Sequence, residues 1–237
     1  NSSPPLPARF RVSSGDRITT LPLTLKPGNS LPPGRYPFSL KLFLNGKQVA
    51  AFDESVVKPL NWLHLGPLPT EKVSPESGFD YQDDFGMSYQ AGGGRESRWK
   101  MGPRGAFSEE GEVFLGRLES EPGSSCLLYT MLEVAQDVKS RMRIRTVNKA
   151  TVCLNGNVIF SGDGTESAAI VETLRKGKNS ILAALSWNQN PAPFLFQLSD
   201  QSGLPLPDAV NQLDDIVNKY ASLNRARSSH NNRPADN

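Results

Sequence analysis

The alternation of apolar and polar residues around position 143 predicts an antiparallel β-protein. Met142 and Ile144 alternate with three arginines, and this period of two indicates a strand with one buried and one solvated face. Further along, Asn155-Gly156 separates two apolar runs, and this dipeptide tolerates the positive φ angles of a type I′ turn. The stretch 141–199 therefore predicts a strand, a tight hairpin and further short strands.

The N-terminal part repeats this pattern around Asn45-Gly46. Four apolar residues share one face of the segment before the turn, namely Phe38, Leu40, Leu42 and Leu44. The sequence LFLNGKQVA at this turn echoes VCLNGNVIF at the later one, and nothing else repeats around either. We interpret the echo as one type of hairpin used in two sandwiches. Because the first unit, 9–60, is short for a full sandwich, we expect a small immunoglobulin-like β unit docked on its neighbour.

Changes in composition mark the other segments. Residues 1–8 are rich in proline and serine and predict a flexible arm, whereas 225–237 predict a disordered tail. Apolar residues recur at three- and four-residue steps over 206–224, which predicts an amphipathic helix. This helix either packs on the sandwich or docks a further domain. The predicted fold class is all-β: an immunoglobulin-like small β-sandwich, a second β-sandwich over 61–205, and a C-terminal amphipathic helix.

Composition and charge narrow the function classes. The chain has 20 glycines and 19 prolines, which suits many short strands better than a few long helices. Its net charge is +2 and it has no run of Lys or Arg, so no nucleic-acid partner is expected. We interpret the arginines on strands as a solvated face. No apolar run reaches the roughly 18 to 20 residues that cross a bilayer, so no membrane span is expected.

The cysteines and the first residue bear on the cellular compartment. The chain begins at Asn1 without a charged and then apolar leader, which a removed signal peptide and a trimmed segment explain equally well. Cys126 and Cys153 both fall on predicted strands, and the alternation puts Cys153 on the face opposite Val152 and Leu154. The two thiols either form a disulfide in a secreted protein or stay unpaired.

A series of motifs over about residues 60–205 resembles the galactose-binding-like jelly-roll modules. In order these are W-x-x-x-G-P, W-K after a variable loop, YTMLEV, ATVCLNGNVIF, LRKGKNSIL and PFLFQLSD. The sharpest parts are Leu154-Asn155-Gly156 and Gly177-x-Asn179. Such modules accompany glycoside hydrolases and other large secreted bacterial proteins. The resemblance therefore implies a jelly-roll accessory module with an extracellular, periplasmic or cell-envelope location, which binds a sugar or braces a neighbouring domain.

Familiar catalytic motifs are absent from the sequence. The histidines are His64, on a predicted strand, and His230, in the predicted tail, and there is no G-x-S-x-G or H-E-x-x-H motif. We therefore expect a protein that is not an enzyme, with a glycoside hydrolase that uses paired carboxylates as the alternative. No cofactor is expected apart from a structural calcium ion. Its candidate ligands are Asp80, Asp83 and Asp84, for which the alternative is a solvated loop.

Aromatic, amide and guanidinium side chains supply candidates for sugar binding, because a sugar ring needs an apolar platform and planar hydrogen-bonding groups. The candidates are Trp187 with Asn188 and Asn190, Trp99 with Arg95 and Arg98, and Tyr81 and Tyr89 in the long loop before residue 105. For both tryptophans the alternative is packing in the core. The predicted function is a non-catalytic carbohydrate-binding or accessory module whose partner is a glycan or a neighbouring protein domain. The alternative is a structural or protein-protein interaction module without sugar affinity, which docks through the helix 206–223.

Overall fold

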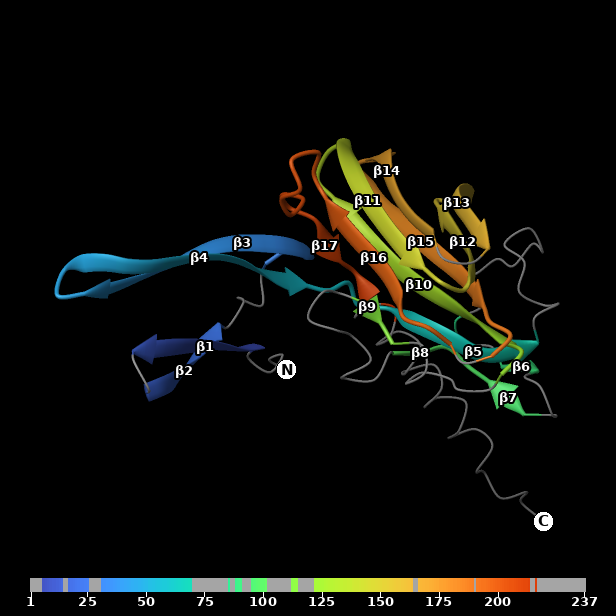
Figure 1. Ribbon diagram of the computed structural model, residues 1–237. Helices are drawn as coiled ribbons and strands as arrows, with labels where there is room; N and C mark the ends of the chain where they lie inside the picture. Colours follow the sequence, from blue (N-terminus) through green and yellow to red (C-terminus); the bar gives the residue numbers. More distant parts are fainter. Residues whose placement is uncertain are drawn as a thin grey trace, which may run out of the picture.

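The structure is a computed structural model that describes residues 6–14, 17–25, 31–69, 85, 88–90, 95–101, 112–114, 122–163, 166–189, 191–213 and 216. The regular structure of this part of the chain is built from β-strands, which confirms the predicted all-β class (Figure 1). Within the same residues, no helix has the length and apolar character to cross a membrane. The predicted tail, 225–237, lies outside the described residues.

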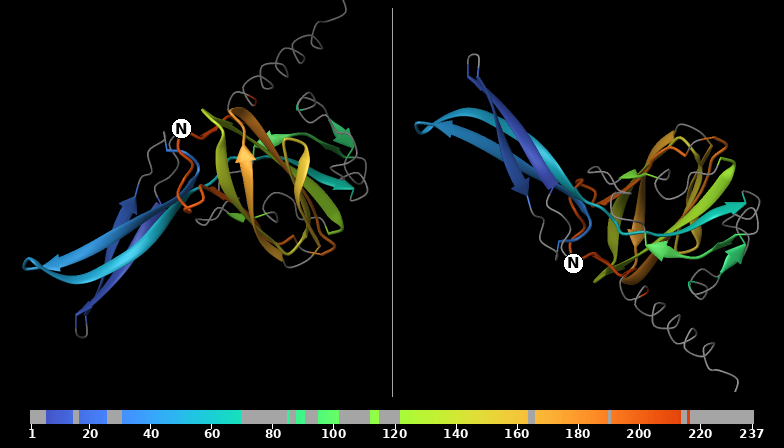
Figure 2. Two further views of the ribbon diagram at one scale, coloured as in Figure 1. Left: turned by 90° about the horizontal axis from the view of Figure 1, so that it is seen from above. Right: turned by 90° about the horizontal axis from the view of Figure 1, so that it is seen from below.

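Two antiparallel sheets face each other (Figure 2). The larger sheet has the order β13 (Asn157–Asp163), β12 (Lys149–Leu154), β15 (Gly177–Ser186), β10 (Ser124–Val134), β5 (Leu63–Pro69) and β8 (Lys100–Met101), with β17 (Val210–Asn211) also paired to β10. The smaller sheet has the order β14 (Glu166–Leu174), β11 (Val138–Thr146), β16 (Phe194–Ser199) and β9 (Glu112–Val113). A short ladder pairs β6 (Tyr89–Gln90) with β7 (Glu96–Ser97). The finer assignment as a jelly roll stays a prediction.

A hydrophobic core fills the space between the two sheets. Met142 and Ile144 of β11 are fully buried in it, whereas the arginines that alternate with them are exposed. Trp62, just before β5, packs edge-on against Phe194 and Phe196 of β16, with ring centroids 6.5 and 5.6 Å apart. The predicted alternation along β11 is therefore confirmed.

The outer face of the larger sheet is apolar as well. Tyr129 of β10 meets the rings of Phe85 and Trp99 edge-on, with centroids 4.8 and 6.3 Å away. Leu213 and Ile216 belong to the same cluster. Because both faces of β10 and β15 are covered, these strands are nearly continuous apolar runs in the sequence. The segment that follows β5 thus contributes aromatic cover for the sheet.

Both cysteines are free thiols on opposite faces of the larger sheet. Cys126 belongs to the core between the sheets, and Cys153 belongs to the cluster on the outer face. Burial raises the pKa of the Cys153 thiol above its ordinary value. Of the two alternatives left by the sequence, the unpaired one therefore holds.

Both Asn-Gly turns are confirmed by positive φ angles, which are 50° at Asn45 and Asn155. The second turn is held by a buried asparagine, Asn179. Its Oδ1 accepts from the side-chain amide of Asn155 at 3.0 Å, and its own Nδ2 donates to the carbonyls of Arg175 and Gly177 at 2.7 and 3.1 Å. Asn155 and Asn179, which belong to the most specific sequence motifs, thus join the β12–β13 turn to the β14–β15 turn. Their role is structural.

Residues 6–58 contribute two separate hairpins. β1 (Leu6–Ser14) pairs with β2 (Arg17–Leu25), and β3 (Gly34–Leu44) pairs with β4 (Lys47–Lys58). The β3–β4 hairpin extends away from the sandwich (Figures 1 and 2). This arrangement does not confirm an immunoglobulin-like unit, which stays a prediction. β1 also begins inside the predicted flexible arm 1–8.

The start of the predicted helix 206–224 is wrong. Val210–Asn211 is a strand against β10, where the Asn211 amide donates to Thr130 Oγ1 at 2.8 Å and to the Met131 carbonyl at 2.9 Å. Leu213 and Ile216 do have helical backbone, and positions 217–224 lie outside the described residues. Strand pairing prevails over the helical period here because β10 extends beyond the N-terminal end of β5. The backbone groups of β10 in this extension need hydrogen-bond partners, and Val210–Asn211 supplies them.

We expect Asn179→Ala to destabilise the protein by about 3 kcal/mol, because it removes the partners of several buried polar groups at once. The measurement is the midpoint of urea unfolding. Asn157→Ala is the control: its amide is exposed and makes a long 3.4 Å hydrogen bond to the Asn155 carbonyl, so its effect should stay within about 0.5 kcal/mol. Equal losses in the two variants would contradict a structural role for Asn179.

Candidate functional site

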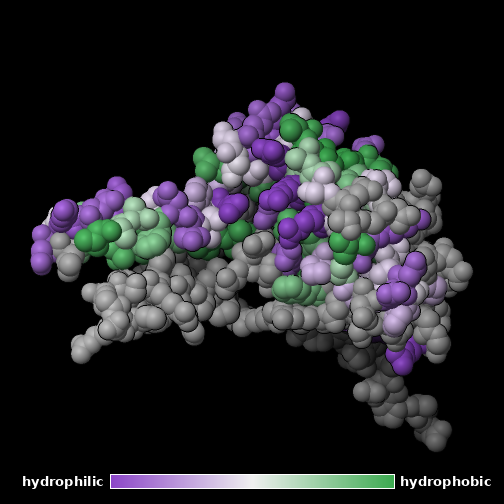
Figure 3. Space-filling view, in the orientation of Figure 1, coloured by the Kyte–Doolittle hydropathy of each residue, from purple (hydrophilic) through white to green (hydrophobic). Residues whose placement is uncertain are grey.

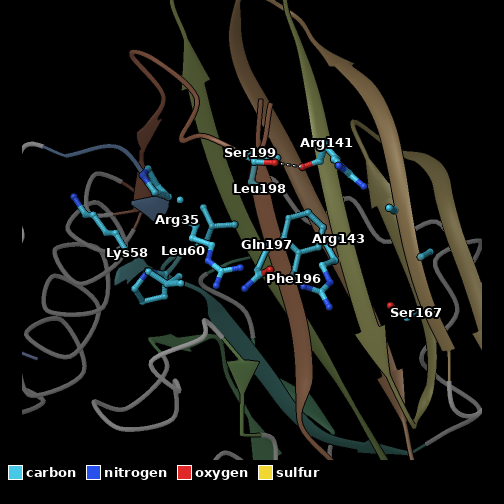
Figure 4. Close-up of a pocket in the computed structure, with 17 residues that line it drawn as sticks. Arg35, Lys58, Leu60, Arg141, Arg143, Ser167, Phe196, Gln197, Leu198 and Ser199 are labelled. Atoms are coloured by element: carbon cyan, nitrogen blue, oxygen red, sulfur yellow. Dashed lines mark hydrogen bonds between the residues drawn. The ribbon is translucent and has the colours of Figure 1, made fainter. Parts of the chain in front are cut away.

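The candidate site is a pocket of about 390 Å³ between the base of the β3–β4 hairpin and the outer face of the smaller sheet. Figure 4 shows Arg35 and Lys58 of the hairpin on one side, Arg141 and Arg143 of β11 on the other, and Gln197 between them. Its further lining residues include Pro33, Gly34, Val57, Leu60, Ser167, Ala168, Ala169, Phe196, Leu198, Ser199 and Gly203. Four positively charged residues therefore line one concave surface, and the amine of one of them, Lys58, is already hydrogen-bonded to the Leu31 carbonyl.

The wall on the sheet side follows from the alternation of β11. Arg141 pairs with Ser199 of β16, and Arg143 pairs with Gln197 of β16 on one side and Ala169 of β14 on the other. Because paired residues of neighbouring strands point to the same face, the two arginines share the outer face with small or polar side chains. Figure 3 shows this hydrophilic surface over β11 and β16. Pairing with strands on both sides thus fixes the backbone from which the two arginine side chains extend.

The wall on the hairpin side depends on a close backbone contact at Gly34. Its φ is +147°, and a Cβ atom there would lie 2.9 Å from Cα of Pro205, so only glycine fits. Next to it, Arg35 Nε donates to Ser55 Oγ at 2.7 Å, and Lys58 Nζ donates to the carbonyl of Leu31. The contact of Gly34 with Pro205 places the base of the hairpin against the turn that follows β16, and the two hydrogen bonds hold Arg35 and Lys58 to residues of the hairpin and of the segment before it.

The pocket is electropositive. Among the residues that the structure describes, no Asp or Glu lines it. Neither Arg141 nor Arg143 has an ion-pair partner in this part of the chain, whereas Arg145, the next residue on the same face, pairs with Glu112. The nearby carboxylate of Asp200 accepts the backbone N–H groups of its own turn, at 2.8 Å from Ser202 and from Leu204. Partial burial lowers the pKa of Lys58 below its ordinary value of 10.5.

The residues proposed from the sequence lie elsewhere. Trp187 is only 5% exposed and belongs to the core, so its ring offers no platform to a sugar in this structure. Trp99 is half-buried against Phe85 and Tyr129, and Tyr89 packs against the same cluster. Both tryptophans therefore pack against apolar neighbours, which is the alternative that the sequence left open for them. None of the three lines the pocket.

The remaining candidates are exposed or lie outside the described residues. Arg95 and Asn188 are exposed and do not line the pocket, and Arg98 pairs with Glu96 at 3.5 Å. Tyr81, Asn190 and the three calcium candidates, Asp80, Asp83 and Asp84, fall outside the described ranges. Within those ranges, no three His, Cys, Asp or Glu side chains come together as a metal site. The calcium ion stays a prediction.

Sequence reasoning missed every residue of this pocket. The signal available was the alternation of Arg141, Arg143 and Arg145, which was interpreted as a solvated face. No local pattern shows that the base of the hairpin, more than 80 positions earlier in the chain, lies opposite these arginines. Tertiary packing turns a common exposed stripe into a pocket wall.

The chain has distant similarity to two solved structures. No family model and no curated protein matches the chain. Among solved structures it is similar to a β-glucosidase from Kluyveromyces marxianus in complex with glucose, with a TM-score of 0.37 and 14% identity over 60% of this chain and 16% of that chain. It is also similar to a family 35 carbohydrate binding module from Clostridium thermocellum, with a TM-score of 0.25 and 17% identity over 32% of this chain and 71% of that chain. Both TM-scores lie below 0.5. The fold and the site define an all-β protein with a cationic surface pocket.

We expect Gly34→Ala to displace the base of the β3–β4 hairpin while the sandwich stays folded, because the new Cβ meets the backbone of Pro205. The measurement is amide hydrogen exchange, which should accelerate in β3, β4 and the 200–205 turn. Gly46→Ala is the control, because it has a positive φ of 76° but open space around it. It should cost about 1–2 kcal/mol locally and leave the hairpin base protected. Unchanged exchange around Gly34→Ala would contradict the contact.

Proposed function

We propose that this chain is a non-catalytic β-sandwich module that binds a carbohydrate in the pocket between the β3–β4 hairpin and the smaller sheet. The observation that carries the proposal is the combination of groups on this one concave surface. Arg35, Arg141, Arg143 and Gln197 offer planar hydrogen-bonding groups, and Ser167 and Ser199 offer hydroxyls. Sugar hydroxyls both donate and accept hydrogen bonds, so such a mixed set of partners suits them.

The size of the pocket supports the same proposal. Its volume of about 390 Å³ falls in the usual range for small-molecule sites, which is about 300–1,000 Å³. Val57, Leu60 and Phe196 also contribute to its lining. Leu60 and Phe196 are buried in the core, so a saccharide would meet mainly the polar groups of the pocket.

A second candidate function is protein-protein interaction through the β3–β4 hairpin. This hairpin extends from the sandwich and exposes Phe43, Val49 and Phe52, of which Phe43 is 61% exposed. Exposed apolar side chains on a projecting two-stranded ribbon are a feature of docking surfaces. The hairpin would then brace a partner domain, and the pocket would be a by-product of its attachment.

A glycan array separates the two functions. The proposal predicts that the chain binds at least one saccharide class, and that Ala169→Trp weakens this binding more than tenfold by filling the pocket without changing its charge. Thr173→Trp is the matched control, because Thr173 is exposed four residues further along the same strand and face, opposite Lys139, and does not line the pocket. Its affinity should stay within about twofold.

Two outcomes would favour the second function instead. One is an array without any hit, and the other is a hit that both tryptophan variants retain. Binding of a candidate partner domain that Phe43→Ser weakens tenfold, with no effect of Ala169→Trp, would then assign the hairpin as the functional surface.

A further inference from the structure

The concentration of positive charge in the pocket is out of proportion to the charge of the whole chain. The net charge is +2, yet Arg35, Lys58, Arg141 and Arg143 all line one cavity. No carboxylate joins them on the lining within the described part of the chain. A neutral sugar needs hydrogen-bond donors but not a cluster of guanidinium groups, whereas an anionic ligand is attracted by such a cluster.

Two described arginines outside the pocket are neutralised by carboxylates. Arg145 continues the same row on β11 and pairs with Glu112 of β9, and Arg98 pairs with Glu96. Arg141 and Arg143 occupy equivalent outward positions, yet the described residues supply neither with an acidic partner. The Cα atoms of residues two apart on a strand lie about 7 Å from each other, so the two positive side chains start from neighbouring points of the sheet, and an anion that contacts both would offset their repulsion.

The pocket is better suited to bind an acidic group than an open positively charged surface would be. The arginines belong to a strand that is paired on both sides, so their backbones are held before a ligand arrives. A guanidinium group donates two parallel hydrogen bonds to a carboxylate or sulfate, and partial enclosure strengthens that attraction relative to open water. Gln197 and Ser199, on the neighbouring strand, pair with the same two arginines and remain within reach of hydroxyls.

We infer that the ligand of this pocket is an anionic saccharide, whose carboxylate or sulfate group is held by Arg141 and Arg143 while Gln197 and Ser199 contact its hydroxyls. This inference rests on the proposed function, since it names the class of carbohydrate for the same site. It goes beyond that function in assigning the arginines as the residues that set specificity.

The test is calorimetric titration of the full chain with four ligands at one salt concentration: a sulfated oligosaccharide, an oligogalacturonate, a neutral oligogalactoside of the same length, and inorganic polyphosphate. We expect one of the two acidic saccharides to bind at least tenfold more tightly than the neutral one and than polyphosphate. The preferred one identifies the acidic group as sulfate or carboxylate.

Three charge-removing variants complete the test. Arg141→Gln and Arg143→Gln should each weaken binding of the acidic saccharide at least tenfold. Lys139→Gln is the matched control, because it removes the same charge from the same face of β11 outside the pocket, and it should change affinity less than twofold. Urea unfolding should show all three variants as stable as the parent chain, since these side chains are exposed.

The contradicting outcomes are distinct. Equal affinity for neutral and acidic saccharides, unaffected by the arginine variants, overturns the anionic ligand and leaves carbohydrate binding standing. Binding of polyphosphate as tight as that of the acidic saccharides overturns the assignment to a saccharide. No binding of any saccharide, here and on the glycan array, overturns both this inference and the proposed function.

Discussion

The alternation of side chains along β11 is the constraint on which both the fold and the site depend. Met142 and Ile144 are fully buried in the core, and Arg141 and Arg143 therefore must face the other way. A register slip of one residue would exchange the two sets, which would bury the arginines and expose the core residues. Pairing with β14 on one side and β16 on the other prevents this, so one strand anchors the sandwich and presents the cationic wall.

The relative sizes of the forces explain why the fold tolerates this wall. Burying one large apolar side chain contributes about 1.5–3 kcal/mol, and the core between the sheets contains many of them. Contacts between exposed charges are worth about 1 kcal/mol or less. Repulsion between neighbouring arginines is thus a small cost beside the core, and an anion at the pocket would relieve it.

The sequence predicted the features that depend on neighbours in the chain. The alternation along β11, the two Asn-Gly turns and the all-β class all follow from local patterns, and the structure bears them out. It did not predict the features that depend on distant contacts. The helical period after position 206 was interrupted because β10 has room for another strand beyond β5. Trp187 has an aromatic ring of the kind that stacks on sugars, but this ring packs in the core between the sheets.

The pocket itself belongs to this second group. One of its walls lies on β11 and the other at the base of the β3–β4 hairpin, and the contact of Gly34 with Pro205 brings the hairpin base to this side of the sandwich. Neither partner of that contact carries a recognisable motif. The lesson is that a stripe of arginines on a predicted strand needs tertiary information before it is assigned to solvent or to a site.

The most direct test of this account is the accessibility of single cysteines introduced at neighbouring positions of β11. The natural thiols, Cys126 and Cys153, are buried and provide the background. In the native protein we expect a maleimide to label Arg143→Cys rapidly and Met142→Cys only after denaturant is added. Native labelling of Met142→Cys at the rate of Arg143→Cys would contradict the orientation of β11, and with it both the core and the cationic pocket.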